Sequence, residues 1–139
     1  MTTTVSRLIP AHPAEVWETL TSRDAMKEFM MGAEVETDWT VGHPITLRGK
    51  AGGRSFEDRG EIRSFEPRKR LSYTHESSMA PGKTHIVTFE LAEKDKGTEV
   101  TVTQAPAQGV DPTADEKMKT QYQKTWAAML RDLEEAVLN

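Results

Sequence analysis

Two histidines are the residues of this sequence best suited to acid–base chemistry or metal binding. His75 and His85 flank a segment from Ser77 to Lys83 that is rich in turn residues. Alternating polar and apolar residues place both histidines on the inward face of neighbouring strands, and a hairpin would set the two imidazoles opposite each other. A zinc site needs at least three protein ligands, and no third ligand is spaced with this pair. We therefore expect no metal at this pair. The specific hypothesis is that His75 and His85 form the polar rim of a pocket, and the alternative is that they are ordinary surface histidines.

Other kinds of reactive site have no signature in the sequence. It contains no cysteine and no Gly-x-Ser-x-Gly turn that would present a nucleophile. Gly49, Gly52 and Gly53 lie between predicted strands and do not open a helix, as a phosphate-binding loop would require. We therefore name no catalytic residue and expect no cofactor. Whether the protein is an enzyme stays open, and the sequence favours a non-enzymatic role.

Composition narrows the class of protein further. The 139 residues fit a single domain, residues 1–139, without a linker or repeat. The net charge is −4, and the 18 basic and 22 acidic residues are spread along the chain, so we expect no nucleic-acid partner. The N-terminus lacks the pattern of a secretion signal, and no segment approaches the roughly 20 apolar residues of a membrane span. We expect a cytoplasmic protein that does not associate with membranes.

Residues 113–138 are predicted to form one long amphipathic helix. Thr113 and Glu116 have the spacing of a capping box, which places the predicted start of the helix at Thr113. Apolar side chains then recur on one helical face: Met118, Tyr122, Trp126, Met129, Leu133 and Val137. A helix of this length needs a broad apolar surface against which to pack.

Short alternating segments upstream supply that surface. Strands are predicted over residues 3–9, 34–39, 44–50, 58–65, 70–76, 84–92 and 98–104, and short helices over residues 13–21 and 23–31. Short connections favour antiparallel pairing. The predicted fold class is therefore α+β: a curved antiparallel sheet of six to seven strands around the long C-terminal helix, with two short helices after the first strand.

A curved sheet with a helix across it tends to enclose a pocket. The predicted ligand-binding residues are Trp39, Leu47, Phe56, Tyr73, His75, His85, Val87, Phe89, Met118, Tyr122 and Trp126. Phe29 and Met30 are candidates for closing one end, and Gln104 is a further candidate polar anchor. The alternative for Tyr122 and Trp126 is that they simply fill the core.

Five segments in this order resemble a known family. They are IPAHPAEVWETLT (9–21), VGHPITLRG (41–49), EDRGEIRSFEPRKRLSYTH (57–75), THIVTFELAEKDKGTEVTVTQ (84–104) and TWAAMLRDLEEAVL (125–138). Together they resemble the START-related, birch-pollen-allergen-like (SRPBCC) superfamily with the helix-grip fold, in the branch named for the activator of the heat-shock chaperone ATPase. The resemblance implies a sheet that grips the C-terminal helix around a hydrophobic cavity. It does not imply a reaction, because one fold can host many functions.

Three positions depart from what the resemblance implies. Relatives often have Gly where this chain has Thr125, and the larger side chain is expected to reduce the cavity. Phe29 stands where a tryptophan is usual. His12 occupies the place of a Ser cap at the first short helix, so the usual capping contact is in doubt.

Three functions remain open at this stage. The leading hypothesis is non-enzymatic binding of a hydrophobic or aromatic small molecule between the sheet and the C-terminal helix. The second is a polyketide cyclase-like or hydrolase-like enzyme that uses Tyr73, His75 or His85. The third is a protein-interaction module in a stress response, either a chaperone co-factor or a homodimer.

Overall fold

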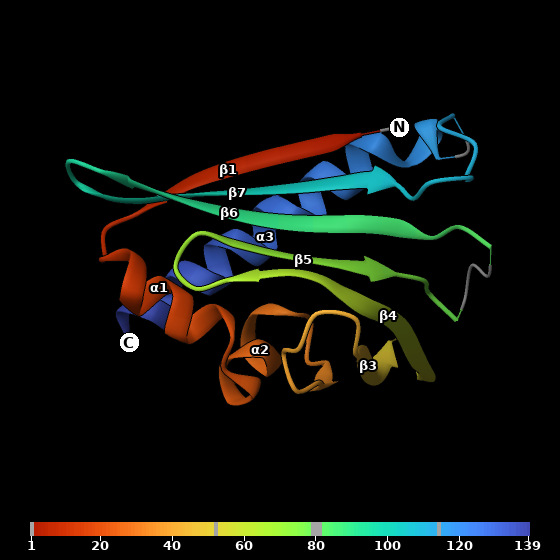
Figure 1. The fold of residues 1–139 in the computed structure, drawn as a ribbon, viewed down its shortest axis with the longest axis horizontal. Coiled ribbons are helices and arrows are strands. Elements are labelled where there is room, and N and C mark those ends of the chain that lie inside the picture. Colours follow the sequence, from red (N-terminus) through yellow and green to blue (C-terminus); the bar gives the residue numbers. More distant parts are fainter. Residues whose placement is uncertain (1, 52, 79–81, 114) are drawn as a thin grey trace.

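The computed structural model describes residues 2–51, 53–78, 82–113 and 115–139 as one α+β unit (Figure 1). Its elements, in chain order, are β1 (Thr3–Ile9), α1 (Pro13–Leu20), α2 (Arg23–Phe29), β2 (Glu34–Glu36), β3 (Pro44–Ala51), β4 (Arg54–Glu66), β5 (Arg70–His75), β6 (His85–Lys94), β7 (Gly97–Pro106), the 3-10 helix η1 (Glu116–Met118) and α3 (Lys119–Leu138). The element order predicted from the sequence is confirmed. No helix among these residues is both long and apolar enough to span a membrane.

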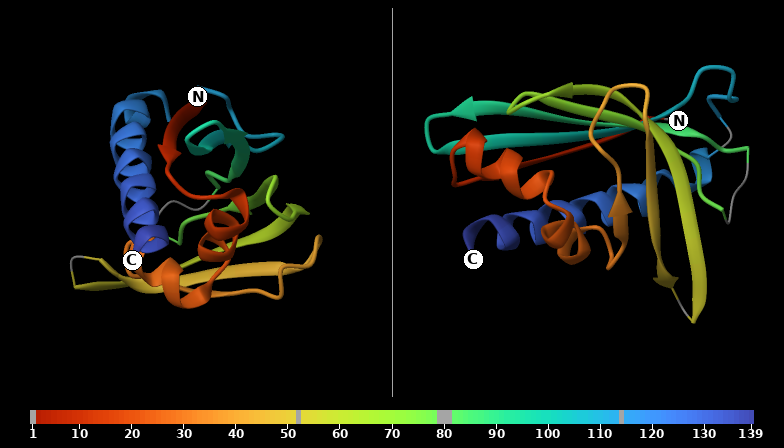
Figure 2. Two further views of the ribbon diagram at one scale, coloured as in Figure 1. Left: turned by 90° about the vertical axis from the view of Figure 1, so that its left-hand side faces the viewer. Right: turned by 60° about the horizontal axis from the view of Figure 1, so that its bottom comes forward.

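The seven strands form one antiparallel sheet in the order β1-β7-β6-β5-β4-β3-β2. A register shift between Ile62 and Ser64 interrupts the pairing of β4 with β5, and such irregularities bend a strand. Gly60 lies near this point. A Cβ atom on residue 60 would overlap the backbone carbonyl oxygen of Thr74. The close approach of the two strands therefore requires glycine. Figure 2 shows the result, a strongly curved sheet that wraps around α3.

The main core lies between the concave face of the sheet, α3 and the two short helices. Leu130 and Leu133 of α3 are fully buried, as are Val16 and Leu20 of α1. Figure 2 shows α1 and α2 beside the C-terminal half of α3. α1 begins at Pro13, and its N-cap residue, His12, makes no side-chain capping hydrogen bond, in agreement with the departure noted in the sequence.

The long helix begins later than the capping-box pattern indicates, and that prediction was wrong. The hydroxyl of Thr113 donates to the carboxylate of Asp111 at 2.8 Å, and the same carboxylate accepts the Thr113 backbone N–H at 2.9 Å. This local turn engages the Thr113 N–H, which a capping box would offer to the carboxylate of Glu116. The chain then passes through η1, and the α-helix proper runs over Lys119–Leu138. Residue 114, inside the predicted helix, lies outside the described residues.

The second predicted strand is also shorter than expected. It ends at Glu36, so Trp39 is not a strand residue as predicted; it lies in a loop with a φ of 60°. Two side chains turn the backbone here: the hydroxyl of Thr37 accepts from the Trp39 N–H at 3.2 Å, and Asp38 accepts from the Thr40 N–H at 2.9 Å. In the predicted turn from Ser77 to Lys83, residues 79–81 lie outside the described residues.

Candidate functional site

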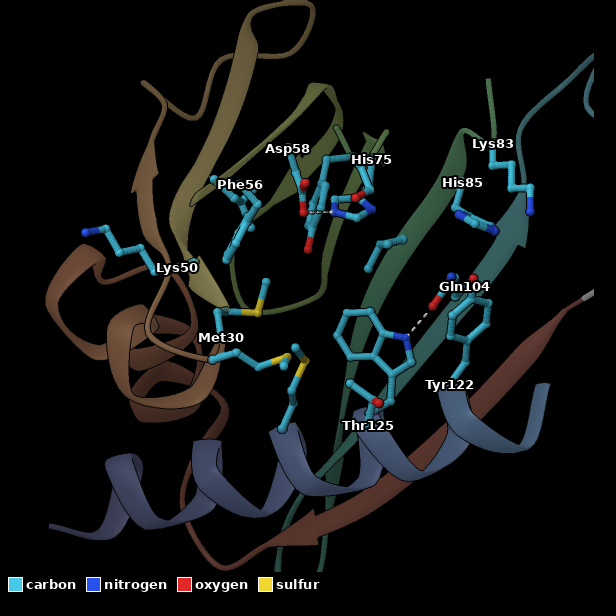
Figure 3. Close-up of a pocket in the computed structure, with 18 residues that line it drawn as sticks. Met30, Lys50, Phe56, Asp58, His75, Lys83, His85, Gln104, Tyr122 and Thr125 are labelled. Atoms are coloured by element: carbon cyan, nitrogen blue, oxygen red, sulfur yellow. Dashed lines mark hydrogen bonds and ion pairs between the residues drawn. The ribbon is translucent and has the colours of Figure 1, made fainter. Parts of the chain in front are cut away.

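A cavity of about 520 Å³ lies between the concave face of the sheet and the N-terminal half of α3 (Figure 3). Its wall is mostly apolar and aromatic. Strands β3 to β7 line it on one side, and Tyr122, Thr125, Trp126 and Met129 of α3 line it on the other. The segment between α2 and β2 adds Met30, Met31 and Ala33. Sites for small molecules typically have this size and this kind of lining.

Eight of the eleven predicted ligand-binding residues line this cavity. They are Leu47, Phe56, Tyr73, His75, His85, Val87, Tyr122 and Trp126. Of the additional candidates, Met30 and Gln104 also line it, whereas Phe29 is a buried core residue of α2. The alternation of the strands and the periodicity of the helix brought these residues together. Ligand binding by them stays a prediction.

The other three predicted residues lie elsewhere. Trp39 packs against Phe65, with ring centroids 5.7 Å apart, because the loop after β2 turns it away from the cavity. Phe89 is buried behind Trp126, whose ring it meets edge to face at 5.7 Å. Met118 is 42% exposed because it belongs to η1, whose turn differs from that of the predicted continuous helix.

Trp126 is held in a fixed orientation in the wall of the cavity that α3 forms. Its indole Nε1–H donates to Oε1 of Gln104 on β7 at 2.6 Å (Figure 3). The hydrogen bond and the edge contact with Phe89 together hold the ring against the sheet. The cavity is therefore bounded by the indole and not filled by it. Trp126 belongs both to the buried core and to the wall of the cavity, and its contact with a ligand stays a prediction.

His75 and His85 face each other across the paired strands β5 and β6, as predicted. Nε2 of His75 lies 2.9 Å from Oδ2 of Asp58 on β4 (Figure 3). Burial acts to raise the pKa of Asp58, but the hydrogen bond and charge of His75, together with hydrogen bonds from Ser78 and Ser77, outweigh it, so the pKa of this carboxyl lies below its ordinary value. Asp58 is therefore an ionised partner that orients the His75 ring.

A second and more deeply buried pair lies beside the first. Nε2 of His85 is 2.6 Å from Oδ2 of Asp115, and both side chains are less than a tenth exposed. Lys83 Nζ lies 3.5 Å from the other oxygen of Asp115. The His85 ring also contacts the Tyr122 ring edge to face, with centroids 5.8 Å apart. Burial and the nearby charge of Asp115 raise the pKa of Tyr122. These contacts tie β6 to the segment that precedes α3.

Sequence reasoning did not find the two carboxylates. Asp58 is 17 residues from His75 and Asp115 is 30 residues from His85, so no local motif joins them. Parity along β4 could have suggested that Asp58 faces inward. Nothing in the sequence could have placed Asp115, because it lies in the irregular turn before α3. Among the described residues, no group of three or more histidine, aspartate or glutamate side chains is arranged to hold a metal ion.

Comparisons with known proteins agree with this geometry. Residues 10–137 match the family model described as Activator of Hsp90 ATPase homolog 1-like protein. Among solved structures, ChR145 from Cytophaga hutchinsonii is 32% identical, with a TM-score of 0.77 over 97% of this chain and 92% of that one. Among curated proteins, no sequence matches significantly.

Two more distant structures show the same fold. The Aha1 dimer from Colwellia psychrerythraea is 19% identical, with a TM-score of 0.73 over 99% of this chain and 96% of that one. DynU16, a protein of the dynemicin biosynthetic locus, is 20% identical, with a TM-score of 0.81 over 99% of this chain and 47% of that one. At these identities the likeness concerns the fold alone.

Proposed function

This chain belongs to the Activator of Hsp90 ATPase homolog 1-like family, within the SRPBCC superfamily, and we propose that it binds a hydrophobic or aromatic small molecule between its sheet and α3. The proposal does not include a chemical conversion of the ligand. Its occupant would lie against Phe56, Val87 and Trp126 on the apolar wall. Family membership is compatible with this role but does not select it.

The observation that supports the proposal is the size of the cavity. At about 520 Å³ it exceeds the lower limit of roughly 300 Å³ that is typical of small-molecule sites. A cavity of this size costs stability, because the side chains around it lack packing partners. Filling it with an apolar ligand restores those contacts and removes apolar surface of both partners from water.

The direct experiment compares two variants that carry the same substitution at different places on α3. Thr125 lines the cavity, whereas Thr120 on the same helix is exposed and does not line it. Thr125→Phe places a phenyl ring in the cavity, and Thr120→Phe places one in solvent. Native mass spectrometry against a panel of neutral aromatics and fatty alcohols identifies ligands, and calorimetric titration measures their dissociation constants.

We expect at least one class of ligand to bind the wild-type protein and the Thr120→Phe variant equally. The Thr125→Phe variant should bind it about tenfold more weakly or not at all, because the new ring occupies the same space. Failure of the whole panel to bind the wild-type protein would contradict the proposal, and so would equal affinities for the two variants.

The two histidine–aspartate pairs favour a second candidate, an acid–base enzyme. Because a carboxylate accepts hydrogen bonds, Nε2 of His75 and of His85 carries a proton in each pair, whether the ring is charged or neutral. The opposite nitrogen, Nδ1, has no hydrogen-bond partner among the described residues, so it can donate a proton to a bound molecule from the charged ring or accept one in the neutral ring. The test is incubation of any ligand found above with the wild-type protein and with a His75→Gln, His85→Gln double variant. Turnover that the double variant loses would favour the enzyme, and an unchanged ligand would favour the binder.

A protein partner and a cytoplasmic location stay predictions. The Aha1 protein from Colwellia psychrerythraea was solved as a dimer, and a dimer of this chain is proposed only by that analogy. Size-exclusion chromatography with light scattering decides it: a mass near 15.6 kDa would contradict a dimer. Recovery of no chaperone by affinity purification after heat stress would count against a chaperone partner.

A further inference from the structure

The hydroxyl of Tyr73 lies at the wall of the cavity without a hydrogen-bond partner among the residues that the structure describes. The side chain of Tyr73 is 1% exposed and lines the cavity. Its phenol makes no hydrogen bond with any of the described residues. Burial raises the pKa of this phenol well above its ordinary value, so the group stays a neutral O–H donor at physiological pH. The hydroxyl can therefore donate to the atoms that occupy the cavity, and a ligand atom that accepts its proton in place of water would be held by a hydrogen bond in an apolar surrounding.

Gln104 presents a second free donor on the same face of the sheet. The indole N–H of Trp126 can only donate, so the amide oxygen of Gln104 must be the atom that faces it at 2.6 Å. The amide nitrogen is then the other end of the group (Figure 3). This NH2 has no hydrogen-bond partner in the part of the chain that the structure describes. Gln104 is 7% exposed and lines the cavity.

The two donors are placed by the strand register. Tyr73 pairs with Val87, and Val87 pairs with Gln104, so the three side chains form one row across β5, β6 and β7. Paired strands lie about 4.8 Å apart, so the Cα atoms of the outer two residues are separated by roughly 10 Å. Val87 forms an apolar floor between them. A ligand that lies on Val87 can therefore reach a donor at either side.

The charged groups around the cavity are already compensated or point away. Asp58 is paired with His75, and Lys83 is paired with Asp115. Lys50 is exposed, and its amine points away from the cavity (Figure 3). An ionic ligand would have to break an existing pair or stay buried without a counter-charge, and both are costly. The Tyr73 hydroxyl and the Gln104 amide nitrogen, which have no partner among the described residues, are neutral donors, and they favour a neutral ligand that accepts hydrogen bonds.

We infer that the ligand of this cavity is a neutral, apolar carbonyl compound, such as an aromatic ketone, whose oxygen accepts from the Tyr73 hydroxyl, with the Gln104 amide as a second donor. This inference rests on the proposed function, because it names the chemical class that the cavity selects. The apolar body of the ligand lies against Val87 and Trp126. The carbonyl oxygen supplies the acceptor that these two donors do not find among the described residues.

The experiment uses two probes of the same shape, benzophenone and diphenylmethane, which differ in the carbonyl group. Calorimetric titration with the wild-type protein should give a dissociation constant about tenfold lower for benzophenone, the value of one buried hydrogen bond. The infrared C=O stretch of bound benzophenone should shift to lower frequency than in hexane. In Tyr73→Phe, the preference for benzophenone and the frequency shift should both become smaller.

Stability separates this role from a structural one. Because the Tyr73 hydroxyl has no partner, Tyr73→Phe should keep or raise the melting temperature of the free protein while it weakens the binding of benzophenone. If the hydroxyl merely supported the fold, the Tyr73→Phe variant would have a lower melting temperature than the wild-type protein. Gln104 is not substituted, since its removal would leave the indole N–H of Trp126 unpaired.

Each possible result has a definite meaning. Equal affinities of the wild-type protein for the two probes would overturn the inference and leave the proposed function intact. A preference that survives in Tyr73→Phe with an unchanged C=O stretch would remove Tyr73 from the site and overturn the inference as stated. Tighter binding of sodium diphenylacetate than of benzophenone would overturn the neutral ligand class. Binding of none of the three probes would count against the proposed function, and the inference would fall with it.

Discussion

The two halves of α3 carry the same apolar periodicity and face two different environments. In the C-terminal half, Leu130 and Leu133 are 1% and 0% exposed and belong to a packed core. In the N-terminal half, Tyr122 and Trp126 border a cavity of about 520 Å³. The difference comes from α1 and α2, which fill the space beside the C-terminal half (Figure 2). Periodicity therefore decides which side of the helix faces inward, and the neighbouring elements decide whether the space is filled.

Leu133→Ala should give the largest effect on stability, because it opens a void in the packed half. We expect the free energy of unfolding to fall by about 2–5 kcal/mol in urea denaturation. Met129→Ala is the matched change at the cavity, which Met129 lines. There we expect a loss of about 1 kcal/mol or less, because fewer packing contacts are removed. Equal losses at the two positions would contradict the contrast between the packed core and the cavity wall.

Trp126→Phe should have an intermediate effect. The substitution removes the hydrogen bond to Gln104 at 2.6 Å and leaves the amide oxygen without its donor. We expect the free energy of unfolding to fall by about 1–3 kcal/mol, measured by urea denaturation at neutral pH. The variant should also enlarge the cavity, so larger aromatic ligands should bind it better than they bind the wild-type protein. Unchanged stability would mean that this hydrogen bond is not formed in solution.

Asp58→Asn should have the smallest effect, and the effect should depend on pH. The folded protein holds the pKa of Asp58 below its ordinary value, so the ionised carboxylate stabilises the fold above that ordinary value. The contribution is lost as the pH falls through the folded-state pKa. We expect the variant to be less stable by about 1 kcal/mol or less at pH 6, since the site is partly hydrated.

The difference between Asp58→Asn and wild type should shrink as the pH falls below 3.8, the ordinary value for an aspartate, and disappear below the folded-state pKa, which urea denaturation over a pH series measures. A difference that stayed constant between about pH 6 and pH 2 would show that Asp58 is not held as an ion pair with His75.

Regular patterns made most of the fold predictable. Strand alternation correctly placed Tyr73, His75, His85 and Val87 on the concave face, because successive side chains of a strand point to opposite faces of the sheet. Helical spacing did the same for Trp126. Residues 13–21 and 23–31 were predicted as helices and agree closely with α1 and α2.

The errors occurred where side chains bind the backbone locally. Thr113 donates to Asp111 and so does not cap the long helix, and Thr37 with Asp38 turns Trp39 away from the cavity. These contacts compete with regular structure and leave no periodic signal. The carboxylate partners of the histidines were missed for a different reason. They come from distant segments, and only the assembled sheet and helix bring them within hydrogen-bonding distance.

The most direct test of the account uses the methionine methyl groups as reporters during a titration with benzophenone. Met30, Met31 and Met129 line the cavity, whereas Met26 lies in the packed core and Met118 is exposed on η1. With 13C-labelled methionine methyl groups, NMR should show that the signals of the three lining residues shift to saturation. The signals of Met26 and Met118 should stay in place. Absence of any shift, or the largest shifts at Met26 or Met118, would contradict binding in this cavity.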